Sequence, residues 1–174
     1  EWFHPTNAPI RPIAMIVMGV IIALLGTLLW LAERMAKHQR GMNQLTLKDA
    51  IYIGLAQALA IFPGVSRSGS TITAGLALGL ERETAARFSF LLSAPIILGA
   101  GIKSVFSGLK QVQGDPNAAA YSLVYLVGFV AAAVSGYLCI RVLLRYLQKN
   151  STNVFVYYRW ALAALIIIVA LTRG

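Results

Sequence analysis

Charged residues are scarce in this chain, and acidic residues are the scarcest. Only 12% of the 174 residues are charged, Asp and Glu together number 6, and 58% are hydrophobic. Soluble domains carry about 25% charged residues, so the composition and the mean hydropathy of +0.72 identify an integral membrane protein whose first partner is the lipid bilayer. The net charge of +9 fits basic residues in short loops between membrane segments. No basic patch with interleaved aromatic residues occurs, which excludes nucleic acid as a partner.

Cysteine and histidine are also nearly missing. The single cysteine, Cys139, lies in an apolar segment, so one chain can form neither a disulfide nor a Cys-based metal site. His4 and His38 lie outside the apolar segments, and no Asp, Glu or His lies inside one. The sequence begins at Glu1 without the charged start, apolar middle and cleavage site of a signal peptide. We therefore expect a fragment of a longer protein.

The apolar segments predict an all-α polytopic membrane protein, with residues 1–174 forming one domain. A bilayer core of about 30 Å needs about 20 helical residues. Four segments meet that length and are expected to span: residues 13–32, 84–105, 121–144 and 155–171. Two shorter pieces, 50–62 and 71–80, cannot span alone. Thr46, with Asp49 three residues later, is expected to cap the first of these pieces.

The two short pieces allow two arrangements. They form either one kinked span with Arg67 near its middle, or a re-entrant hairpin of two half-helices that meet at mid-membrane. The breaker-rich loop 63–69 favours the hairpin, because such interrupted segments mark binding sites in membrane proteins. Charge favours it too, since the hairpin puts loops 33–49, 81–87 and 141–159 on one side with ten basic residues against four on the other. The ten are Arg34, Lys37, Arg40, Lys48, Arg82, Arg87, Arg141, Arg145, Lys149 and Arg159, and the four are Arg11, Lys103, Lys110 and Arg173.

The loop between the half-helices has the chemistry of an anion site. Arg67 is costly inside a membrane and is expected to be buried at the tip for a function. Glycine lets backbone N–H groups turn inward, hydroxyls donate hydrogen bonds, and a helix beginning near residues 68–70 turns its positive end to the loop. The candidate ligand-binding residues are Gly64, Ser66, Arg67, Ser68, Gly69, Ser70 and Thr71, together with Gln57, which either binds ligand or hydrogen-bonds the loop backbone. The pattern predicts a phosphate-bearing ligand handled within the membrane.

The residues Pro63-Gly64-Val65-Ser66-Arg67-Ser68-Gly69-Ser70-Thr71-Ile72 closely resemble the signature of a known family, the undecaprenyl-diphosphate phosphatases or bacitracin-resistance proteins of the bacterial inner membrane. The flanking stretches 54–60 and 85–92, and Tyr158-Arg159, are similar to that family as well. The resemblance implies hydrolysis of undecaprenyl diphosphate to undecaprenyl phosphate and phosphate, which recycles the lipid carrier for cell-wall synthesis. It also implies that Arg67 holds the diphosphate, that Ser66, Ser68 and Thr71 contact phosphate oxygens, and that a serine, Ser66 or Ser68, is a candidate nucleophile.

The chain departs from the family pattern in one large respect. Members have two inverted repeats, and the first should bring a paired glutamate motif and a histidine that hold a divalent cation, Mg or Ca, and supply the base or the nucleophile. Neither motif occurs here, so the chain resembles the C-terminal part only, has no metal ligands of its own, and is expected to show little or no activity alone. A homodimer is compatible with the resemblance. The alternative function is a secondary transporter or flippase for an anionic or phosphorylated substrate, because re-entrant half-helices also serve transport.

Overall fold

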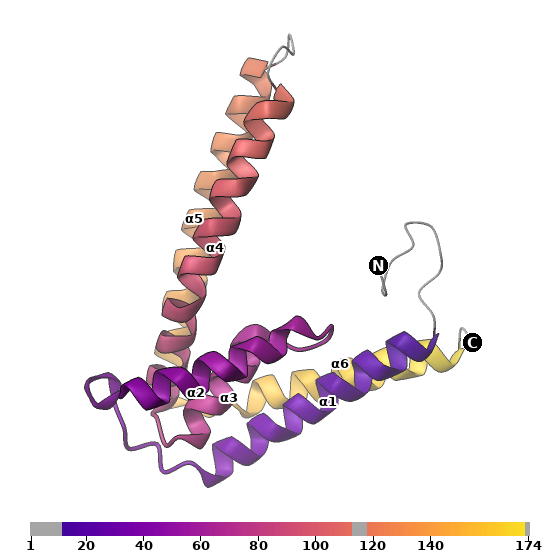
Figure 1. Ribbon diagram of the computed structural model, residues 1–174. Coiled ribbons are helices and arrows are strands. Elements are labelled where there is room, and N and C mark those ends of the chain that lie inside the picture. Colours follow the sequence, from indigo (N-terminus) through magenta and orange to yellow (C-terminus); the bar gives the residue numbers. More distant parts are fainter. Residues whose placement is uncertain (1–11, 113–117, 173–174) are drawn as a thin grey trace.

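The computed structural model describes residues 12–112 and 118–172, and the predicted helices are present in that part of the chain (Figure 1). His4, Arg11 and Arg173 lie outside the described residues. Short 3-10 turns at Met42–Gln44 and Leu59–Ile61 adjoin the second helix. The α-helices are α1 (Pro12–Met35), α2 (Leu47–Ala58), α3 (Arg67–Ala77), α4 (Arg82–Val112), α5 (Ala118–Lys149) and α6 (Asn153–Thr172). The all-α prediction is confirmed.

Within the described part of the chain, four helices are long and apolar enough to cross a membrane: α1, α4 over Arg82–Gly108, α5 over Leu123–Lys149, and α6. This finding confirms a multi-pass membrane protein. Both α4 and α5 are longer than the predicted segments 84–105 and 121–144, and α4 continues through Pro95. The two pack against each other and extend away from the α1–α6 pair (Figure 1). Apolar side chains are exposed along most of their length.

The short helices α2 and α3 form the predicted hairpin. They lie side by side and turn at a loop that contains Gly64, whose φ of +90° favours glycine (Figure 1). Arg67 is the first residue of α3, so it does not lie within one continuous spanning helix. A Cβ built on Gly64 would stand 3.3 Å from the carbonyl oxygen of Met18, within the uncharged part of α1. Met18 precedes the polar Glu33 by about 22 Å of helix, so the hairpin tip lies deep along a spanning helix.

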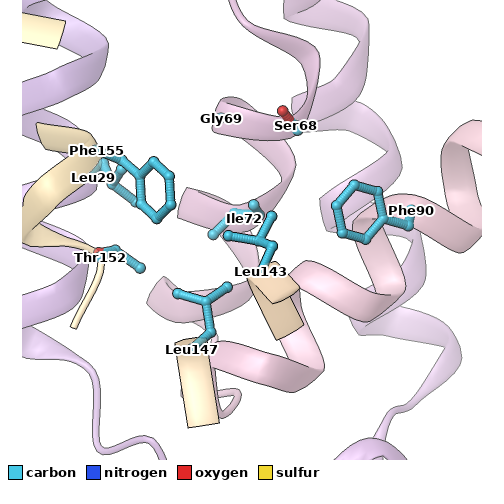
Figure 2. Close-up of a pocket in the computed structure, with 9 residues that line it drawn as sticks. All are labelled: Leu29, Ser68, Gly69, Ile72, Phe90, Leu143, Leu147, Thr152 and Phe155. Carbon is cyan, nitrogen blue, oxygen red and sulfur yellow. The ribbon is translucent and has the colours of Figure 1, made fainter. Parts of the chain in front are cut away.

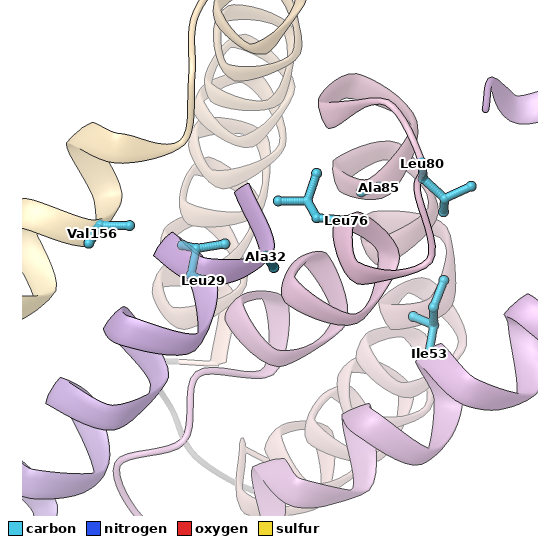
Figure 3. Packing of buried hydrophobic residues seen from close by; sticks show 7 residues of the cluster. All are labelled: Leu29, Ala32, Ile53, Leu76, Leu80, Ala85 and Val156. Atoms are coloured by element: carbon cyan, nitrogen blue, oxygen red, sulfur yellow. The ribbon is translucent and has the colours of Figure 1, made fainter. Parts of the chain in front are cut away.

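The buried core joins α3 to its neighbours. Gly75 of α3 packs closely on Ala85 of α4, where an added Cβ would approach 2.9 Å. Small residues allow such close approach in membranes. The cluster in Figure 3 draws side chains from α1, α2, α3, α4 and α6 and holds the hairpin against the spanning helices; it comprises Leu29, Ala32, Ile53, Leu76, Leu80, Ala85 and Val156.

The guanidinium of Arg40 joins the two helices at the polar end of the hairpin, opposite the tip. Arg40 Nη2 donates to Asp49 Oδ2, and Arg40 Nη1 donates to Asp49 Oδ1 at 3.1 Å and to the carbonyl of Leu78 at 3.0 Å. The side-chain hydrogen bond from Arg40, aided by bonds from Thr46, lowers the pKa of Asp49 below its usual range. The predicted cap is confirmed, since Thr46 Oγ1 accepts from the Asp49 N–H at 3.3 Å. Arg40 therefore ties the beginning of α2 to the end of α3.

Candidate functional site

The N-terminus of α3 lies at the hairpin tip, slightly earlier in sequence than predicted. Ser66 is the N-cap, and its Oγ accepts from the Gly69 N–H at 3.2 Å. The Ser70 N–H bonds the Ser66 carbonyl at 2.9 Å. Helix geometry leaves the N–H groups of Arg67 and Ser68 without an intrahelical acceptor, at the positive end of the helix dipole. This end of α3 is therefore suited to bind an anion.

Arg67 and Ser68 are both exposed in this chain. The expectation that Arg67 is buried was therefore wrong for the described structure. The physical reason is its position, because helical side chains lean toward the N-terminus and a first-turn side chain extends past the helix end. Exposure leaves the guanidinium accessible to a ligand that reaches the tip.

Ser70 and Thr71 face the core instead of the tip. Both are buried; Ser70 Oγ donates to the Arg67 carbonyl at 2.9 Å, and Thr71 Oγ1 lies 3.0 Å from the same carbonyl. Thr71 Oγ1 also lies 2.6 Å from Ser89 Oγ of α4. A hydroxyl has one proton to donate, and a phosphate oxygen needs a donor. In the described structure the Thr71 hydroxyl contacts α4 and the Ser70 hydroxyl bonds within α3, and contact of either hydroxyl with ligand stays a prediction.

A second arginine lies on the same helix end. Arg159, the seventh residue of α6, places its guanidinium against Gly69, so closely that a Cβ at position 69 would stand 2.6 Å from Arg159 Cζ. Its Nη1 atom is buried and has no hydrogen-bond partner among the described residues. The sequence analysis counted Arg159 in loop 141–159, which overlaps the predicted span 155–171, and noted the similarity of Tyr158-Arg159 to the family, but gave Arg159 no role in the site. The signal that could have identified Arg159 as a site residue is its place within a spanning helix, directly before a long apolar run, where an arginine is costly.

An apolar cavity of about 170 Å³ begins at the α3 N-terminus. Figure 2 shows the Ser68 hydroxyl and Gly69 at one end, with hydrocarbon side chains around the rest of the space. The cavity draws its lining from α1, α3, α4, α5 and the start of α6; the residues are Leu29, Ser68, Gly69, Ile72, Phe90, Leu143, Leu147, Thr152 and Phe155. The anion-binding helix end thus adjoins a space suited to hydrocarbon.

Gln57 lies near the end of α2 and carries a buried Oε1 atom that accepts no hydrogen bond from the described residues. No backbone N–H of the described loop donates to this oxygen. Its part in ligand binding stays a prediction.

The described residues do not fit a divalent cation. No three His, Cys, Asp or Glu side chains come together in this part of the chain. The tip carries guanidinium groups and N–H donors, which repel a cation, and it lacks the carboxylates from which Mg and Ca usually take oxygen ligands. We derive no chemical step through a metal from these residues.

Comparison with known proteins places the chain in a family. The family model described as bacitracin resistance protein BacA matches residues 6–165. The undecaprenyl-diphosphatase of Thermomicrobium roseum is 46% identical over 160 residues, covering 90% of this chain and 55% of the relative. Those of Anaeromyxobacter sp. and Alteromonas mediterranea are 48% and 47% identical, covering 83% and 88% of this chain and 47% and 56% of the relatives. The chain spans about half the length of the curated relatives it matches. It belongs to the bacitracin resistance protein BacA family.

Proposed function

We propose that the α3 N-terminus binds the diphosphate group of undecaprenyl diphosphate, as part of a protein that hydrolyses this lipid to undecaprenyl phosphate and phosphate. The observation that carries the proposal is Arg159, whose buried Nη1 has no hydrogen-bond partner among the described residues and whose guanidinium lies on Gly69. A buried donor without an acceptor costs about 1–3 kcal/mol, and a phosphate oxygen at the helix end would remove that cost. The names of the relatives supply the lipid diphosphate as the substrate class.

The charges at the tip suit a diphosphate. Arg67 and Arg159 present planar guanidinium groups, each able to hold two phosphate oxygens. The first-turn N–H groups and the helix dipole add fixed positive charge that needs no rearrangement as negative charge develops during phosphoryl transfer. Ser66 Oγ accepts from Gly69, so its own proton remains available to a phosphate oxygen. Ser68 is the exposed hydroxyl nearest the cavity and is the serine best placed to approach the ligand.

The apolar cavity supports a lipid substrate over a soluble diphosphate. Its lining beyond Ser68 and Thr152 is hydrocarbon, and it opens beside the helix end that would hold the charged group (Figure 2). We propose that the first part of the polyprenyl chain lies in this cavity and the remainder among the lipid-facing helices. Burial of hydrocarbon would contribute about 0.8 kcal/mol for each CH₂ group.

Further parts of the proposal concern the surroundings of the site. Because the proposed substrate is the lipid carrier of cell-wall synthesis, the proposed location of the protein is the bacterial inner membrane. A divalent cation, Mg or Ca, would take its ligands from outside the described residues of this chain. A homodimer stays a prediction that the oligomeric state in detergent would test.

Phosphate release from undecaprenyl diphosphate, measured with a protein of the full length of the relatives that contains this sequence, tests the proposal. Release that falls in Arg67→Gln and Arg159→Gln variants, with normal folding, is the expected result. Uptake of the lipid or of a soluble phosphate compound into sealed vesicles without hydrolysis would instead support the transporter alternative. Near-normal release in both variants would refute the role of the two arginines.

A further inference from the structure

Three polar side chains join the ends of three helices on one side of the molecule. Glu33, near the end of α1, accepts at Oε1 from Arg82 Nε of α4 at 2.6 Å and at Oε2 from Thr152 Oγ1, just before α6, at 2.8 Å. The Glu33 and Thr152 residues are 7% and 2% exposed. The sequence analysis placed Glu33 in a polar loop, but α1 continues through Met35 and buries it. These bonds also confirm that loops 33–49, 81–87 and the loop before α6 share one side.

A carboxylate at this place is unfavourable unless something else holds it there. The C-terminal end of a helix carries partial negative charge, so Glu33 is repelled by the dipole of its own helix. Burial removes it from water as well, which is costly for a charge. The Arg82 bond offsets both costs, and it leaves the second carboxylate oxygen for Thr152. Buried polar groups of this kind can fix the register of packed helices.

The bond from Thr152 to Glu33 is related to the position of Arg159 along α1 by helix geometry. Seven residues from Glu33 toward the membrane interior lies Gly26, and seven residues beyond Thr152 lies Arg159. A Cβ built on Gly26 would stand 3.3 Å from the Cβ of Arg159, so the two positions face each other two turns below the polar bond. The indole Nε1 of Trp160 donates to Thr27 Oγ1 at 3.3 Å in the same layer.

Elsewhere the α1–α6 contact is largely apolar, and the Trp160–Thr27 bond and the close packing at Gly26 and Gly19 also favour the observed register. A slip by one helical turn would move a residue by about 5.4 Å along the axis and would remove the Arg159 guanidinium from Gly69. We propose that Glu33 is a positioning residue: its hydrogen bond with Thr152 adds to these contacts in fixing the register of α6 on α1 and so places Arg159 on the N-terminus of α3. The functional consequence rests on the proposed anion site, while the register itself does not.

Cross-linking of the 174-residue chain in detergent tests the register. In a Cys139→Ala background, one double variant is Leu29→Cys with Val156→Cys, because the native side chains at these positions share the buried cluster. The other is Leu25→Cys with Val156→Cys, because position 25 lies one helical turn before position 29 and would meet position 156 after a slip of one turn. The yield of the Leu29–Val156 pair should exceed that of the Leu25–Val156 pair. Thr152→Val should lower this ratio about tenfold, as expected for the loss of a hydrogen bond to a charged group. Thr152→Ser, which keeps the hydroxyl, should restore it.

A matched control separates register from general stability. Thr172→Val removes the exposed hydroxyl at the other end of α6, which donates only to Val169, and should leave the ratio unchanged. If Thr152→Val unfolds, Thr152→Ala in the same assay replaces it, since it also removes the hydroxyl that donates to Glu33. An unchanged ratio in a folded Thr152→Val or Thr152→Ala variant would overturn the inference.

Titration of the same variants with inorganic pyrophosphate separates the two proposals. Weaker binding by Thr152→Val, with rescue by Thr152→Ser, supports the positioning role. Absence of pyrophosphate binding by the unaltered chain would count against the proposed anion site, while the cross-linking ratio would still decide the register.

Discussion

Replacement of Gly69 by alanine should disable the anion site without harming the fold. Position 69 lies in the first turn of α3, where alanine is favoured over glycine by up to about 1 kcal/mol. The added Cβ would stand 2.6 Å from Arg159 Cζ, which is closer than a real contact permits. The atoms that it meets are the far end of a flexible side chain, so the guanidinium moves away while the helices stay packed. Stability should hold or rise, and the Arg159 contribution to ligand binding should be lost.

The size of the effect follows from the lost interaction. A hydrogen bond to a charged group contributes about 1.5–3 kcal/mol, which is about 10- to 100-fold in affinity at 1.4 kcal/mol for each factor of ten. Isothermal titration of the chain in detergent with inorganic pyrophosphate measures it, together with the thermal unfolding midpoint. Gly54→Ala is the matched control, because a Cβ at Gly54 of α2 meets nothing within 4 Å. Equal affinity of the Gly69→Ala and Gly54→Ala variants would refute the proposed role of Arg159.

Three further predictions concern the hairpin. Arg67→Ala in a protein of the relatives' full length should lower phosphate release by about 10²–10³-fold, the range for loss of one preorganised donor to developing charge; near-normal release would reject the role. Arg40 holds the pKa of Asp49 below its usual range. The Arg40–Asp49 pair therefore stabilises the fold fully above about pH 4, and this stabilisation is lost as pH falls through the depressed pKa. The fall in Tm on acidification should be shallower for Asp49→Asn than for the unaltered chain, and the same dependence of Tm on pH in both would contradict this. Ser89→Ala should cost about 0.5–1.5 kcal/mol of unfolding free energy by removing the bond to Thr71, and an unchanged urea midpoint would show that this bond contributes nothing.

The sequence predicted the architecture well, because membrane burial imposes simple rules on length and charge. The long apolar segments located the four spanning helices, and the breakers at Pro63 and Gly64 located the turn of the hairpin. The charge count predicted that three loops share one side, and the Glu33 bonds to Arg82 and Thr152 confirm it.

The site was predicted only in part, because side-chain direction depends on packing that a linear pattern does not contain. Hydroxyl content alone made Ser70 and Thr71 equivalent to Ser66 and Ser68, yet the packing of α3 on α4 directs the first two into the core. Arg159 is more than eighty residues from Gly69 in sequence. The contact between the two depends on how α6 packs along α1, which the sequence does not reveal.

The most direct measurement is arginine-selective ¹⁵N NMR of the chain in detergent during titration with inorganic pyrophosphate. Side-chain signals of Arg67 and Arg159 should shift together with one dissociation constant, while those of Arg40 and Arg82, already paired with carboxylates, should not move. Uniform shifts of all arginines, or a response of the paired arginines without Arg67 and Arg159, would contradict a diphosphate receptor at the N-terminus of α3.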